Sequence, residues 1–153
     1  MAKIYCDMNI YNRSFDDQKQ FRIRLETIAI GILLGEIELG YHSLFWSFIL
    51  ADENKRNPYQ QRRQGIEIMS GLCGENKIFA SEEIKILANK IQQLSSSKPK
   101  DALHIACAEY AKCDYFITCD DRLVKTIQSN KERIGLSLVI MNPVDLVRKE
   151  MES

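Results

Sequence analysis

The chain has 153 residues, 45% of them hydrophobic, which fits a single domain over 1–153 with its own core. Its 21 basic and 21 acidic residues balance, so bulk charge does not bind it to nucleic acid, and any such contact needs a local patch. The five cysteines are scattered without a CxxC pair, which favours free thiols in a cytoplasmic protein. With only two histidines, a zinc site is not expected. No apolar run approaches the roughly 18 residues of a membrane span, so no membrane segment is expected either.

The first half of the chain predicts two strands and three helices. Apolar residues recur at helical spacing after Asp16 and Asp17, either of which can cap that helix, and Gly35 is expected to end it. Ser43 is expected to open the second helix, and Gly74 to end the third. The expected elements are a strand at Lys3–Cys6, a loop at Met8–Phe15, a helix at Gln18–Leu34, a strand at Ile37–Tyr41 and helices at Leu44–Asn54 and Tyr59–Leu72.

The second half continues the alternation of strands and helices. Pro99 suits the first turn of a helix, and Ser81 or Glu82 suits the start of another. The expected elements are a strand at Ile78–Ala80, a helix after Ser81, a loop at Leu94–Pro99, a helix at Asp101–Lys112, strands at Tyr115–Thr118 and Leu136–Met141, and a closing helix at Val144–Met151. This alternation predicts an α/β fold, a three-layer α/β/α sandwich around a mostly parallel sheet.

Acidic residues follow two of the predicted strands. Asp7 ends the first strand, and Asp120 and Asp121 follow the fourth in the stretch TCDDR. Asp101 stands in the first turn of the helix before the fourth strand. Ligands of parallel sheets bind outside the carboxyl ends of the strands, so three acids are expected at one edge, as ligands for Mg²⁺ or Mn²⁺. Structural alternatives remain: Asp7 as a loop acid, Asp101 as a partner of the helix dipole and Asp121 as the cap of a helix that starts at Arg122.

Several motifs together resemble PIN-domain proteins of the VapC-like toxin ribonuclease family. They are KIYCDMNIYNR, LADENKRNP, KPKDALHIACAEYAKCDYFITCDDRL and VIMNPVDLV, which cover nearly the whole chain. The resemblance implies a PIN-like fold and a Mg²⁺- or Mn²⁺-dependent endoribonuclease, the toxin of a toxin–antitoxin pair. It also implies an RNA substrate, an antitoxin partner and a homodimer.

The resemblance assigns catalytic roles by position. The catalytic acids are expected to be Asp7, Glu53, Asp101 and Asp120, with Asp52 as the alternative to Glu53. The metal is assigned to Asp7, Asp101 and Asp120. The supporting residues are Asn9, Thr118 and Asp121, the last as an extra acid near the metal. His104 follows Asp101 by one helical turn, and a packed, hydrogen-bonded histidine is favoured there over a general base.

One basic cluster follows Glu53 directly, and it suggests how a phosphate backbone is held. The cluster consists of Lys55, Arg56, Arg62 and Arg63, with Tyr59 between them. These side chains are expected to bind RNA phosphates beside the acids, and a solvated helix face is the alternative.

Two other functions fit acids at strand ends. One is a PIN-like domain without nuclease activity that serves as a binding or regulatory module. The other is a phospho-acceptor receiver domain, which requires a lysine at a late strand end. The last predicted strand ends in Asn142-Pro143 instead, which disfavours the receiver domain.

Overall fold

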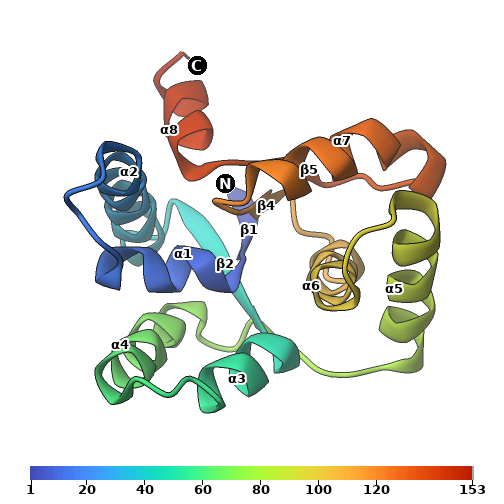
Figure 1. The fold of residues 1–153 in the computed structure, drawn as a ribbon, viewed down its shortest axis with the longest axis horizontal. Helices are drawn as coiled ribbons and strands as arrows, with labels where there is room; N and C mark the ends of the chain where they lie inside the picture. Colours follow the sequence, from blue (N-terminus) through green and yellow to red (C-terminus); the bar gives the residue numbers. More distant parts are fainter. Residues whose placement is uncertain (153) are drawn as a thin grey trace.

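A computed structural model describes residues 1–152 as a parallel sheet between helices (Figure 1). The strands are β1 (Ala2–Cys6), β2 (His42–Ser47), β3 (Lys77–Ile78), β4 (Tyr115–Ile117) and β5 (Val139–Met141). The helices are α1 (Met8–Asn12), α2 (Phe21–Glu38), α3 (Phe48–Lys55), α4 (Gln60–Ser70), α5 (Glu82–Ser95), α6 (Pro99–Tyr110), α7 (Asp121–Ile134) and α8 (Pro143–Met151). Two 3₁₀ turns, η1 (Arg13–Phe15) and η2 (Gly71–Cys73), extend α1 and α4.

The sheet has the strand order β3-β2-β1-β4-β5, and all its pairs are parallel. The chain adds strands to one side of β1 first and to the other side afterwards, so the strand order reverses between β1 and β4. Cys6 pairs with Ile117 there, which places Asp7 level with Thr118. The crevice outside the carboxyl ends of these two strands is the usual place for a ligand.

Helices cover both faces of the sheet, which confirms the predicted α/β class and the three layers. Figure 1 shows α1 and α2 on one side and α5 and α6 on the other. The central strand is fully buried at Ile4, Tyr5 and Cys6, so it reads as an unbroken apolar run instead of an alternating one. The packed layers fix the positions of the strand ends, and with them the side chains that follow β1 and β4.

Three sequence-based boundaries are wrong. The predicted loop at Met8–Phe15 is helical, because the Asp7 side chain caps α1 by accepting the amide N–H of Met8. The predicted strand at Ile37–Tyr41 lies partly inside α2, and the real strand is His42–Ser47. The helix after it begins at Phe48, capped by Ser47 rather than opened by Ser43.

Helix α2 is longer than predicted and has an apolar face toward solvent. It continues past Gly35 to Glu38 and is preceded by Gln20, not capped by Asp16 or Asp17. Four apolar residues that suggested this helix lie on its outer face, with exposed fractions of 69%, 40%, 57% and 46%: Phe21, Leu25, Ile28 and Ile32. Helical spacing therefore predicted the helix correctly, while the buried side is formed by other residues.

The five cysteines are buried and form no disulfide within residues 1–152. Burial raises the pKa of Cys107, Cys113 and Cys119 to about 12, so these thiols stay protonated at neutral pH. Over the same residues, no helix combines the length and the apolar character needed to cross a membrane.

Candidate active site

Asp7 is fixed at the end of β1 by residues of α1 and by the residue that follows β4. One carboxylate oxygen accepts the Met8 amide at 2.8 Å, and the other accepts the Thr118 hydroxyl at 2.9 Å and the Asn9 amide at 3.3 Å. Thr118 also accepts the Asn9 amide at 3.0 Å and the backbone N–H of Asp120 at 3.1 Å. Asn9 and Thr118 thus join the acid after β1 to the acid after β4.

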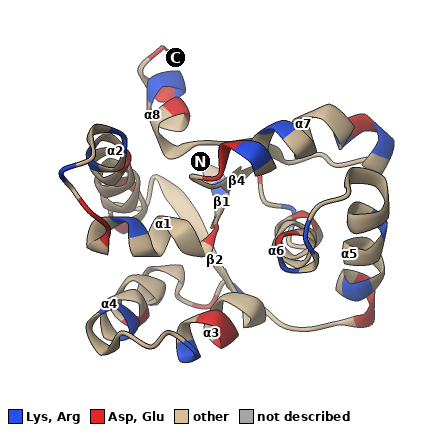
Figure 2. Ribbon diagram, viewed as in Figure 1, with Lys and Arg blue, Asp and Glu red and all other residues tan. Residues whose placement is uncertain are grey.

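Asp120 and Asp101 reach the same edge from two helices. Asp120 caps α7 by accepting the N–H of Leu123 at 3.1 Å, and this corrects the prediction that Asp121 caps a helix starting at Arg122. Asp101 lies in the first turn of α6, behind Pro99. Both acids line a cavity of about 320 Å³ at this edge. Figure 2 shows acidic segments at the start of α1, on α3 and at the start of α7.

Glu53 is held by a chain of hydrogen bonds that runs into the core. Its carboxylate bonds Nε2 of His104, whose Nδ1 lies 2.7 Å from the Tyr5 hydroxyl. That hydroxyl lies 2.6 Å from Oγ of Ser47. His104 is 1% exposed and bonded at both nitrogens, which confirms the packed histidine, and its role here is to position Glu53. The alternative acid, Asp52, points away and pairs with Arg56 at 3.3 Å.

The acids influence one another electrostatically. Burial raises the pKa of Asp7; His104, Thr118 and the Met8 amide lower it, and Glu53 raises it further. Burial also raises the pKa of Asp101, with further contributions from Asp7 and Asp120. Such mutual repulsion is what a bound cation relieves, so this edge of the sheet has the electrostatics of a cation site.

The carboxylates do not form a tight cage. Across residues 1–152, no three of the four acids bring ligand oxygens within 4.8 Å of one another. Mg²⁺ usually keeps several waters and takes one or two protein carboxylates, so an open set of oxygens suits it. The donor set therefore fits Mg²⁺ or Mn²⁺ bound partly through water.

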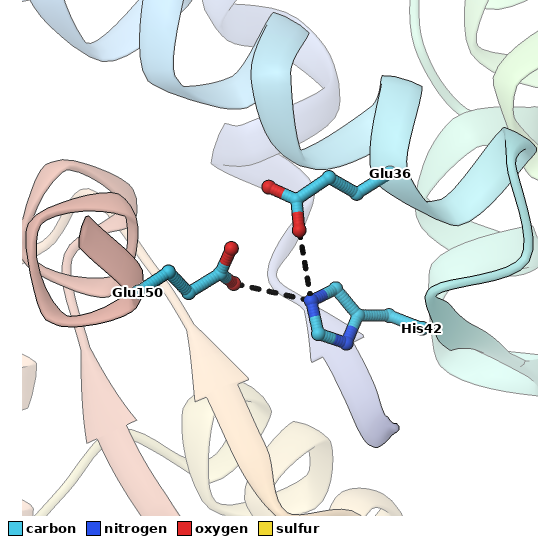
Figure 3. A group of neighbouring side chains, drawn as sticks. All are labelled: Glu36, His42 and Glu150. Atoms are coloured by element: carbon cyan, nitrogen blue, oxygen red, sulfur yellow. Dashed lines mark hydrogen bonds and ion pairs between the residues drawn. The ribbon is translucent and has the colours of Figure 1, made fainter. Parts of the chain in front are cut away.

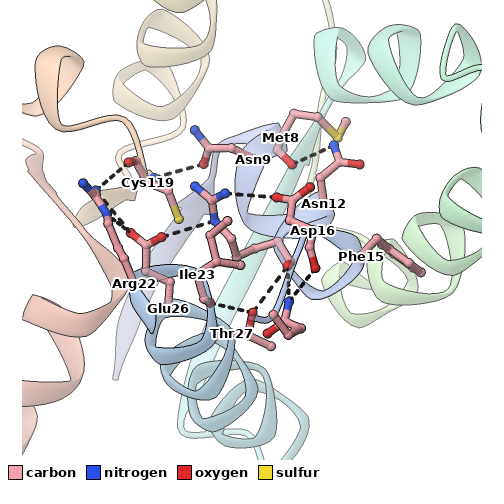
Figure 4. Close-up of polar contacts among 12 residues, drawn as sticks. Met8, Asn9, Asn12, Phe15, Asp16, Arg22, Ile23, Glu26, Thr27 and Cys119 are labelled. Atoms are coloured by element: carbon pink, nitrogen blue, oxygen red, sulfur yellow. Dashed lines mark hydrogen bonds and ion pairs between the residues drawn. The ribbon is translucent and has the colours of Figure 1, made fainter. Parts of the chain in front are cut away.

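Asp121 belongs to a different network from its neighbour. It pairs with Arg22 of α2 at 2.7 Å. Arg22 also donates to the carbonyl of Cys119 at 3.1 Å (Figure 4). Arg22 and Arg13 flank the buried carboxylate of Glu26, at 3.4 and 3.2 Å. This network fastens the TCDDR loop to α2 and turns Asp121 outward.

The predicted basic cluster is divided by its contacts. Arg62 bonds Asp16 at 3.1 Å and the Phe15 carbonyl at 2.9 Å, so it fastens α4 to η1. Arg63 donates to the Asn57 carbonyl at 2.9 Å. Lys55 is exposed, and Arg56 is exposed and paired with Asp52. Two of the four cations thus have structural contacts, and two remain at the surface of α3.

Sequence reasoning missed two groups beside the acids. Lys98 and Arg122 line the same cavity as Asp101 and Asp120. Each stands three or fewer residues from a predicted acid, and this proximity was the available signal. Tyr5 and Ser47 were also missed, because a tyrosine and a serine on strands give no sign that they support a histidine on a distant helix.

Comparison with known proteins shows similarity in structure and none in sequence. No family model and no curated protein matches the chain. The FitAcB structure from Neisseria gonorrhoeae is similar over 92% of this chain and 97% of its own, with a TM-score of 0.58 and 13% identity. A structure of FitAB bound to an IR36 DNA fragment is similar over 92% of this chain and 95% of its own, with a TM-score of 0.57 and 14% identity. The likeness shows a PIN-like fold, as the sequence resemblance predicted.

Proposed function

We propose that this PIN-like domain is a Mg²⁺- or Mn²⁺-dependent endoribonuclease, the toxin of a toxin–antitoxin pair. The main support is the meeting of Asp7, Glu53, Asp101 and Asp120 at the point where the strand order reverses. Glu53 raises the pKa of Asp7, and Asp7 and Asp120 raise the pKa of Asp101. Such perturbation is typical of functional sites.

The carboxylates of Asp7, Asp101 and Asp120 would hold the ion. Asp7 is the most rigid of the three, since both of its oxygens accept hydrogen bonds. Asp120 keeps one oxygen on the α7 cap and offers the other. When bound, the ion would lower the pKa of a water and stabilise the charge that develops on the phosphate.

Glu53 would act as an acid-base residue beside the ion. The His104 ring fixes one of its oxygens, and its own charge acts on Asp7. A carboxylate oriented in this way can accept a proton from an attacking water. His104 serves Glu53 from the buried side, which leaves the proton transfer to the carboxylate.

Lys98 and Arg122 would bind phosphates next to the acids. Their side chains are exposed and line the cavity of Asp101 and Asp120. Lys55 and Arg56 would extend this contact along α3. Phosphate contacts of this kind position the backbone without selecting a base.

Cleavage of RNA by variants in each acid tests the proposal. Single-stranded and structured RNA would be incubated with Mg²⁺ or Mn²⁺, and with EDTA. Asp101→Asn and Asp120→Asn should slow cleavage roughly a thousandfold or more, because they weaken the metal site. Asp52→Asn is the matched control for Glu53→Gln and should stay active. Cleavage that survives EDTA or equals wild type in Asp101→Asn would refute the metal mechanism. Bound metal without cleavage of any RNA would favour the binding-module alternative.

An antitoxin would cover the exposed face of α2. The two similar structures are those of FitAcB and of FitAB bound to a DNA fragment. In this chain Phe21, Leu25, Ile28 and Ile32 form an apolar stripe of the kind that receives an amphipathic segment. Ile28→Glu should abolish capture of the co-expressed antitoxin without changing the mass of the isolated chain in light scattering. A dimer that Ile28→Glu dissociates would instead assign the stripe to the homodimer predicted from the sequence.

A further inference from the structure

A second group of ligand-type side chains lies at the opposite edge of the sheet. Glu36 near the end of α2, His42 at the start of β2 and Glu150 near the end of α8 meet there (Figure 3). Nε2 of His42 lies 3.1 Å from a carboxylate oxygen of each glutamate. In residues 1–152, this is the group of three whose ligand atoms all lie within 4.8 Å of one another.

The spacing of these three atoms suits a small transition-metal ion. Ligands at about 2.1 Å from a tetrahedral zinc ion stand roughly 3.4 Å apart, which is close to the two distances of 3.1 Å from His42. Carboxylate oxygens and an imidazole nitrogen are zinc ligands, and three protein ligands with one open position are a common set. We propose that Glu36, His42 and Glu150 bind one Zn²⁺ ion that fastens α8 to α2 and β2.

A cavity beside Glu36, His42 and Glu150 gives a metal ion a path to these side chains. A cavity of about 260 Å³ borders the group and is lined by His42, Glu150, Met1 and Lys149, among others. Lys149 is directed to the Tyr115 hydroxyl at 3.1 Å, so its ammonium group lies on the aromatic ring and away from the ion's position. Water from the cavity can take the fourth position on the metal.

The electrostatics also favour a cation. Burial and the neighbouring Glu36 raise the pKa of Glu150, while His42 lowers it. Two carboxylates that share one ring nitrogen repel each other, and a divalent ion removes that repulsion. The fold places them together because α8 packs along α2 and runs back toward the amino ends of the strands.

The contacts of the His42 ring change when the ion binds. Nδ1 of His42 accepts the backbone N–H of Ala2 at 3.2 Å, which leaves the ring proton on Nε2 between the carboxylates. Zinc on Nε2 sends the proton to Nδ1, so the Ala2 contact breaks. The hydrogen bonds of Nε2 with the two glutamates and the bond from Ala2 are lost, and three metal–ligand bonds form. The site escaped the sequence reasoning because that reasoning sought cysteine and histidine pairs, whereas two glutamates supply most of this site.

Zinc titration of the full chain tests the site. Protein stripped with a chelator would be titrated with Zn²⁺ by calorimetry, and with Co²⁺ to record the visible absorption of a tetrahedral complex. We expect one ion per chain and a Tm that rises with zinc concentration. Glu150→Gln and His42→Gln should weaken binding at least tenfold. Circular dichroism would check folding, and Glu150→Gln, in the last turn of α8, is the milder change.

Two controls separate this site from the rest of the molecule. Glu38→Gln removes an exposed charge two residues from Glu36 and should bind zinc like wild type. Asp101→Asn alters the other edge of the sheet and should also keep the ion, so the result does not depend on the proposed nuclease. Absence of zinc binding in wild type would overturn the proposal. So would undiminished binding in folded His42→Gln and Glu150→Gln, or loss of the ion in Asp101→Asn.

Discussion

Asp101→Asn should make the metal-free protein more stable while weakening its metal site. Burial and the charges of Asp7 and Asp120 raise the pKa of Asp101, so its ionised form is disfavoured in the fold. The repulsion is on the order of 2 kcal/mol at the dielectric of such sites. The dipole of α6 offsets about 0.5 kcal/mol of it. The amide keeps the shape without the charge, and the net gain is about 1.5 kcal/mol, or a Tm increase of about 3–6 °C for a chain of this size.

The pH dependence of this gain has a definite sign. In the unfolded chain Asp101 ionises at its ordinary pKa, whereas the folded protein holds the proton to higher pH. The loss of stability caused by the Asp101 charge is absent below the pKa of the unfolded chain and complete above the raised pKa of the folded protein. The Tm of Asp101→Asn should therefore exceed that of wild type most at neutral pH, and this difference should shrink as the pH falls toward about 4.

Calorimetric melting in EDTA and in Mg²⁺ measures both effects. Glu75→Gln removes one exposed loop charge and should leave Tm unchanged. Saturating Mg²⁺ should raise the Tm of wild type more than that of Asp101→Asn, because the ion binds the intact site more tightly. A Tm for Asp101→Asn equal to or below that of wild type in EDTA at neutral pH would refute the reasoning.

Three further changes probe the supports of the site. Glu26→Ala should lower the free energy of unfolding in urea by about 2–3 kcal/mol, since it removes the buried carboxylate that Arg13 and Arg22 share and leaves Arg13 with Asp16 alone. Thr118→Val removes a hydrogen bond to Asp7, so it should cost about 1–2 kcal/mol and weaken Mn²⁺ binding in calorimetry. Replacing Lys98 and Arg122 with Ala should flatten the salt dependence of RNA binding, whereas Arg62→Ala should lower Tm and leave that dependence unchanged.

The order of elements could be predicted from the sequence because strands and helices alternate with distinct periods. The error around β2 has a physical cause. Ile37 belongs to the buried side of α2, and Ile37, Leu39 and Tyr41 alternate with Glu38 and Gly40, which is also the pattern of a strand. A run of this kind does not show where the helix ends. Gly35 added to the error, since glycine is tolerated inside a helix that packing holds in place.

The exposed face of α2 could not be predicted for a related reason. Helical spacing identifies a face, but an apolar face that awaits a partner has the same pattern as one that packs on the core. In α2 the buried side includes Glu26, whose charge is balanced by Arg13 and Arg22. Because a charged residue is buried here, the side of the helix that the sequence assigns to solvent packs inside the protein. The sequence does not show this, since the arginines that balance Glu26 are recognised only in the folded structure.

The choice between Asp52 and Glu53 was decidable from the sequence. Residues three and four positions apart share a helix face. Ile49 and Leu50 are the buried apolar residues of α3, and Glu53 follows them by four and three positions. Asp52 follows Ile49 by three positions but Leu50 by only two, so it lies farther toward solvent and pairs with Arg56. The positions of Ile49 and Leu50 on the helix thus indicate that Glu53 faces the sheet edge. This holds even though the predicted start of the helix is wrong by four residues.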